Sequence, residues 1–127
     1  MSFGTRSTQY TDLRREYKRF SMPAILVLTT MPNDESKTAE LARTLIDERL
    51  AACVNVHGPM ASTYRWKGQV ERDAERQVVI KTTRGRVPAL ETRLRELHPY
   101  ELPELIVIGV EDGGKAYLAW VAGETRP

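Results

Sequence analysis

From residue 24 onwards, apolar residues follow two alternating patterns, continuous runs and a spacing of three or four. The run at 24–30 is rich in β-branched residues, which is typical of a strand buried on both faces. Between residues 41 and 50 the apolar positions recur at helical spacing with charged residues opposite them, which predicts an amphipathic helix. Asn33 or Asp34 offers the N-cap, because a short polar side chain can accept from the free amide groups of a first turn.

The rest of the pattern predicts a long hairpin, a second helix, one more strand and a terminal helix. Lys67-Gly68 supplies the hairpin turn, and Gly58-Pro59 interrupts the first arm as a bend or bulge does. Pro88 suits the first turn of a helix that Pro99 ends. The expected elements are strands at 51–56, 62–66, 70–83 and 105–108, and helices at 88–98 and 117–121.

The predicted order is therefore β-α-β-β-α-β-α. Its first six elements form the split β-α-β pattern of a ferredoxin-like α+β sandwich, with helices packed on one face of an antiparallel sheet. Residues 1–21 contain little to bury, and we expect them to form a mobile N-terminal extension. Residues 22–127 then form a single ferredoxin-like domain.

Charge and composition restrict the function classes. The chain has 127 residues and a net charge of +2, but residues 1–21 carry five basic and two acidic side chains. The predicted domain is therefore slightly acidic, which argues against nucleic-acid binding. No stretch of eighteen apolar residues predicts a membrane span, and the first twenty residues hold no apolar signal segment. Together with the single cysteine, this predicts a cytoplasmic protein.

The single cysteine, Cys53, allows two interpretations. It could be a nucleophile or a soft metal ligand, but its apolar surroundings favour a small, unreactive core residue. In a regular strand Cys53 and His57 would share a face and could form half of a metal site. A surface position for His57 is the simpler expectation. No motif assembles a nucleophile, a base and an orienting group, so we expect no enzymatic activity.

The segment from His98 to Glu104 is the densest cluster of polar groups between two elements. It could bind a divalent ion or a polar ligand, or it could be a proline-stiffened loop whose polar groups cap a helix. Lys81 could attract an anion or be solvated. Tyr64 and Trp66 share one face of the hairpin, where they could form a partner surface or pack within one subunit.

Five segments, in this order and spacing, resemble the CutA family of divalent-cation tolerance proteins. They are 49–56 (RLAACVNV), 62–68 (STYRWKG), 80–82 (IKT), 98–104 (HPYELPE) and 117–120 (YLAW), within a resemblance that covers about residues 23–122. The resemblance implies a ferredoxin-like homotrimer similar to PII signalling proteins. In such a trimer the long hairpins reach across subunits, which implies an interface role for Tyr64 and Trp66.

The resemblance also implies a cleft between subunits near the 98–104 segment. We expect Lys81, His98, Tyr100 and Glu101 to line that cleft. The implied function is non-catalytic divalent-cation tolerance in the cytoplasm. The alternative is a PII-like signalling module whose cleft holds a small anionic or polar molecule.

Copper ligands proposed for some members are a cysteine near the end of the first strand and two histidines before Pro-Tyr. The corresponding positions here are Thr29, Leu97 and His98, so only one ligand matches. We therefore expect Cu²⁺ or another divalent cation to bind weakly, with His98, Glu101 and Glu104 as the candidate ligands.

Overall fold

The computed structural model describes residues 23–127, so the predicted extension at 1–21 lies outside the described residues. The elements are β1 (Ala24–Pro32), α2 (Glu35–Asp47), β2 (Cys53–Trp66), β3 (Gln69–Thr83), a short 3₁₀ turn (Arg84–Arg86), α3 (Val87–Leu97), β4 (Ile106–Gly109) and α4 (Lys115–Glu124). The predicted order is confirmed. The two strand runs at 51–56 and 62–66 form one strand, and the terminal helix is longer than predicted.

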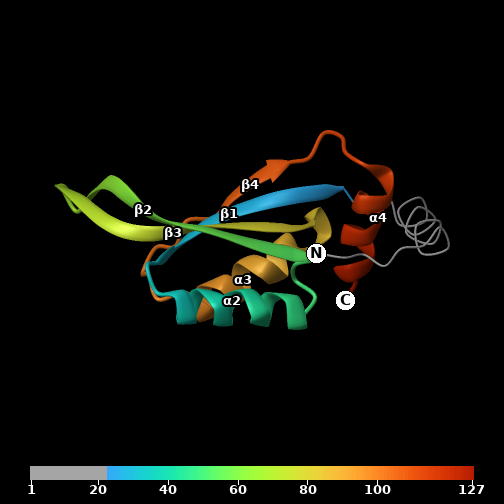
Figure 1. The fold of residues 1–127 in the computed structure, drawn as a ribbon, viewed down its shortest axis with the longest axis horizontal. Coiled ribbons are helices and arrows are strands. Elements are labelled where there is room, and N and C mark those ends of the chain that lie inside the picture. The colour runs from blue at the N-terminus through green and yellow to red at the C-terminus, as the bar shows by residue number, and fades with distance from the viewer. Residues whose placement is uncertain (1–22) are drawn as a thin grey trace.

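The four strands form one antiparallel sheet in the order β2-β3-β1-β4. Helices α2 and α3 lie together on one face of this sheet (Figure 1). This is the ferredoxin-like α+β arrangement that the sequence predicts. Asp34 is the N-cap of α2, and its carboxylate accepts the Lys37 amide at 2.9 Å.

The main core lies between the sheet and the two helices. Because side chains alternate along a strand, the odd residues of β1 and the even residues of β3 point to the helices. They meet apolar side chains that recur at helical spacing on α2 and α3. The fully buried members are Ile25, Val27, Leu45, Val78, Ile80, Leu90 and Leu94.

The opposite face of the sheet is only partly covered. Helix α4 packs over one end, where Val121 contacts Ala24 and Ala52 in a second, small core. Farther along, Ile106 and Ile108 of β4 remain 48% and 42% exposed. Within residues 23–127 this apolar surface is left uncovered. We call the side of the sheet opposite α2 and α3 the open face.

Cys53 lies on the open face, which corrects the prediction of a buried core residue. It is the first residue of β2, and the next side chain, Val54, packs against the main core. Strand alternation therefore turns Cys53 away from the helices, and its side chain is half-buried. Cys53 and His57 do share a face, because the β2–β3 register is regular up to His57.

The β2–β3 hairpin extends well beyond the rest of the sheet (Figure 1). Its register shifts between His57 and Met60, where two residues of β2 oppose one residue of β3. This β-bulge confirms the irregularity predicted at Gly58-Pro59. The extra residue exchanges the two faces of β2, so that the even residues after it share the open face with Glu75 and Gln77 of β3.

Candidate functional site

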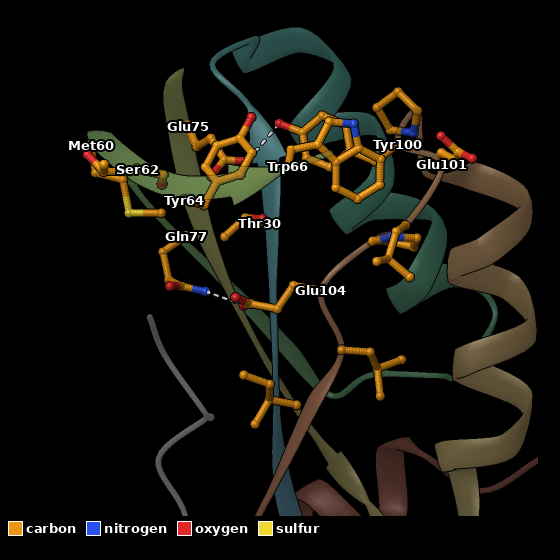
Figure 2. A pocket seen from close by; sticks show the side chains of 16 residues that line it. Thr30, Met60, Ser62, Tyr64, Trp66, Glu75, Gln77, Tyr100, Glu101 and Glu104 are labelled. Atoms are coloured by element: carbon orange, nitrogen blue, oxygen red, sulfur yellow. Dashed lines mark hydrogen bonds between the residues drawn. The ribbon is translucent and has the colours of Figure 1, made fainter. Parts of the chain in front are cut away.

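A groove of about 830 Å³ lies where the hairpin leaves the sheet. Its walls are the β2 residues after the bulge, Thr30 near the end of β1, the middle of β3 at Glu75 and Gln77, and the loop at 98–105 that joins α3 to β4. Figure 2 shows the aromatic side chains near one end of the groove and the Gln77–Glu104 pair below them, towards its middle. The lining residues that carry polar or aromatic chemistry are Tyr64, Trp66, Glu75, Gln77, Tyr100, Glu101 and Glu104.

Glu75 is the most buried acid of the groove, with 7% of its surface exposed. The Tyr100 hydroxyl donates a hydrogen bond of 2.7 Å to one of its carboxylate oxygens (Figure 2). Burial, together with this bond, raises the pKa of Tyr100 above its ordinary value of 10. Tyr100 is therefore a neutral donor, and it supplies no positive charge to balance the carboxylate.

The hairpin contributes two aromatic side chains to the groove. The Tyr64 hydroxyl donates to the Asp73 carboxylate, and this bond raises the pKa of Tyr64 to about 12. The Lys67 ammonium lies 5.6 Å from the centre of the Trp66 ring and 3.9 Å from the Glu101 carboxylate. A lysine of the chain itself is thus held by an aromatic face and an acid at the mouth of the groove.

Gln77 connects the sheet to the 98–105 loop. Its amide nitrogen donates to the Thr29 carbonyl at 2.7 Å and lies 3.5 Å from a carboxylate oxygen of Glu104. Glu104 is half-buried, lines the groove and faces Gln77 of β3.

His98 holds the loop through both ring nitrogens. Nδ1 accepts the Tyr100 backbone N–H at 3.1 Å, so the ring proton is on Nε2, which donates to the Thr30 carbonyl at 2.6 Å. The side chain is buried, and burial lowers its pKa below the ordinary value of 6.5. His98 is also the C-cap of α3. This geometry corresponds to the capping interpretation of the segment.

The candidate metal ligands are not grouped within one chain. Among residues 23–127, no three His, Cys, Asp or Glu side chains lie together in a way that could hold a metal ion. His98 uses both nitrogens, Glu101 pairs with Lys67, and Glu104 faces Gln77.

Lys81 lies apart from the other expected cleft residues. Its ammonium sits 5.8 Å from the centre of the Tyr117 ring, which belongs to α4. It lies four positions from Gln77 along β3, or about 13 Å of extended chain. The fold of the chain therefore brings Tyr100 and Glu101 to the groove, with His98 behind them, but does not bring Lys81.

Sequence reasoning missed Glu75 and Gln77, which form the floor of the groove. They belong to a polar stretch of β3, where most side chains are exposed. The bulge after His57 is the signal that could have located them, since it determines which β2 side chains share their face.

Comparison with known proteins gives consistent results. A family model described as CutA1 divalent ion tolerance protein matches residues 25–124. The divalent-cation tolerance protein CutA of Thermus thermophilus is 40% identical over 100 residues, which cover 79% of this chain and 96% of that protein. The human protein CutA is 42% identical over 122 residues, 96% of this chain and 66% of the relative. A crystal structure of CutA1 from Oryza sativa matches with a TM-score of 0.79 and 38% identity, covering 83% of this chain and 95% of that one.

Proposed function

Because the chain belongs to the CutA1 family of divalent-ion tolerance proteins, we propose that it acts without catalysis in the tolerance of divalent cations, and that cations meet it at the carboxylates of the groove. One observation supports this location of the cation site. Glu75, Glu101 and Glu104 line the groove, and among its described lining residues none is Lys, Arg or His. A concave surface with this charge attracts cations and repels anions. The same charge disfavours an anionic ligand.

We expect a single chain to bind a divalent ion only weakly. Copper(II) gains affinity from several nitrogen and oxygen ligands in a tetragonal arrangement. His98 would have to give up its bond to the Thr30 carbonyl or to the Tyr100 amide before it could coordinate. We therefore assign His98 to positioning the loop, and Glu104 to contacting the cation together with Glu101.

Calorimetric titration with Cu²⁺ and with Zn²⁺ tests this assignment. The two ions should bind the parent chain with affinities within about tenfold of each other, since carboxylates alone select poorly between them. Glu104→Gln should weaken both, whereas Glu111→Gln, an exposed acid outside the lining, should weaken neither. Tight binding of Cu²⁺ alone that survives Glu104→Gln would refute the carboxylate site.

We further propose that the protein is a homotrimer. Ile106 and Ile108 expose apolar surface on the open face, and β2 and β4 are free sheet edges within residues 23–127. Association of subunits would cover both. Tyr64 and Trp66, on the extended hairpin, are the proposed contacts beside the groove. Light scattering should give three times the chain mass of 14.4 kDa, and a monomer at micromolar concentration would contradict the proposal.

The proposed location is the cytoplasm. The support is the single cysteine, since the chain can form no internal disulfide. Within residues 23–127, no helix is long and apolar enough to cross a membrane.

A further inference from the structure

We infer that the two ends of the open face carry opposite charges that bind each other between copies of this chain. Lys81 of one subunit then lies against Glu71 and Asp73 on the hairpin of the next subunit. The inference rests on the proposed homotrimer and goes beyond it, because it names the contact that orders the subunits. Its basis is the distribution of charge along β3 and the apolar surface between the two charged ends.

The hairpin end of the open face is acidic. The odd residues of β3 lie on this face, and three successive ones are Glu71, Asp73 and Glu75. Glu71 and Asp73 are exposed and do not line the groove. The Asp73 carboxylate accepts from the Tyr64 hydroxyl, which is a neutral donor. The pKa of Tyr64 is raised to about 12, first by this hydrogen bond and also by the negative charges of the cluster.

The other end of the open face carries a cation. Among the described strand residues that lie on this face, Lys81 is the only Lys or Arg. Its ammonium lies 5.8 Å from the centre of the Tyr117 ring, and within residues 23–127 no acid forms a salt bridge with it. Lys81 is ten positions from Glu71 along β3, or about 33 Å, so the two cannot meet within one chain. Figure 1 shows the hairpin and α4 at opposite ends of the sheet.

The surface between the two charged ends is apolar. Partly exposed side chains of β1, β3 and β4 form it, namely Leu26, Leu28, Val79, Ile106 and Ile108. Burial of this patch favours association but selects no orientation, because the hydrophobic effect is not directional. Opposite charges at the two ends do select an orientation, since like ends repel each other. A second copy of the chain is the occupant that fits, because the face carries both members of the charge pair.

A ring of subunits uses both ends of every open face. In such a head-to-tail arrangement, each subunit offers its hairpin acids to one neighbour and its Lys81 to the other. The contact requires no ligand in the groove, and it leaves Glu101 and Glu104 to the proposed cation site. It also brings a lysine beside the groove, which the fold of one chain does not do.

Subunit exchange measures the strength of this contact. Trimers of the full chain with and without ¹⁵N are mixed, and native mass spectrometry follows the appearance of mixed trimers. Lys81→Glu should speed exchange about tenfold, because it brings like charges together and a leaving subunit breaks its contacts with both neighbours. Glu71→Lys should speed exchange for the same reason. The double variant Lys81→Glu/Glu71→Lys restores opposite charges and should exchange within about threefold of the parent rate.

Arg72→Glu is the matched control, because it reverses the charge of the next residue on the opposite face of the hairpin. It should leave the exchange rate within about twofold of the parent rate. Raising NaCl from about 0.05 M to about 0.5 M should narrow the difference between Lys81→Glu and the parent, since salt screens charge pairs. Circular dichroism verifies that each variant is folded. Where a single reversal prevents assembly, the double variant should recover the trimer.

Three results would overturn the inference: a parent rate of exchange in Lys81→Glu, no recovery in the double variant, or an equal acceleration by Arg72→Glu. If light scattering gives the parent a mass of three chains, each of these results leaves the proposed homotrimer standing. A monomeric parent would refute the homotrimer and the charge contact together.

Discussion

Replacing His98 by Phe should destabilise the fold through the loop that carries the groove. Phe keeps a planar ring of similar size but forms neither hydrogen bond. The change leaves the Thr30 carbonyl and the Tyr100 amide without the partners that His98 provides at 2.6 and 3.1 Å. The His98 side chain is 7% exposed, so water replaces these bonds poorly. At about 1–2 kcal/mol for each orphaned group, the expected loss is about 2–4 kcal/mol.

The variant should also change the pH dependence of stability. Burial holds the pKa of His98 below 6.5 in the folded protein, whereas in the unfolded chain it returns to about 6.5. Between these two values the unfolded chain binds more protons than the folded one. The parent protein should therefore lose stability as the pH falls from 7 through 6.5 towards the folded pKa. His98→Phe should lack that part of the loss, since Phe binds no proton.

Urea unfolding at pH 7.5 and at pH 5.5, at one protein concentration, measures both effects. His57→Gln is the matched control, because His57 is exposed and should not alter the pH dependence that His98 produces. The reasoning is refuted if His98→Phe is as stable as the parent at pH 7.5. It is also refuted if the variant keeps the full loss of stability at pH 5.5.

Three other substitutions test particular contacts by the same urea assay. Tyr100→Phe should cost about 1.5–3 kcal/mol, because it removes the hydroxyl donor from buried Glu75, and an unchanged midpoint would contradict that bond. Thr29→Val should stabilise by about 1 kcal/mol, since the buried Thr29 hydroxyl finds no hydrogen-bond partner within residues 23–127; a loss of stability would imply a partner for it. Gly58→Ala should lower the free energy of unfolding by about 1–3 kcal/mol, because Gly58 has φ +141° and an added Cβ would lie 3.0 Å from Arg76 Cγ. An unchanged stability would mean that the bulge adapts to the added methyl group.

The hydrophobic pattern was sufficient to predict the fold, because each element buries one face against a common core. The apolar residues of α2 recur at Leu41 and Leu45, and those of α3 at Leu90 and Leu94, so the period of 3.6 is visible in the sequence. The position of Cys53 was harder to predict. An apolar neighbourhood does not reveal which face a strand residue occupies, and here α4 leaves part of the second face uncovered.

The groove could not be predicted from the same pattern. Its floor is Glu75 and Gln77, polar residues that sequence alone would assign to a solvated ribbon. Glu75 is buried because the bulge turns Tyr64 and Trp66 to its side and the loop folds Tyr100 over it. Three segments that are distant in the sequence therefore bury Glu75 together. The polarity of any one segment does not indicate this burial.

The three positions that correspond to the copper ligands proposed for related proteins all have structural roles in this chain. Thr29 is fully buried on the helix side of β1, where a neutral hydroxyl offers no anionic ligand. Leu97 packs against the main core, and His98 uses both nitrogens to hold the loop. With all three positions committed to packing or loop geometry, the proposed contacts for a cation are the groove carboxylates of Glu101 and Glu104. We therefore expect cation binding by this chain to depend on carboxylates more than on imidazole or thiolate, and titration of Glu104→Gln tests that expectation directly.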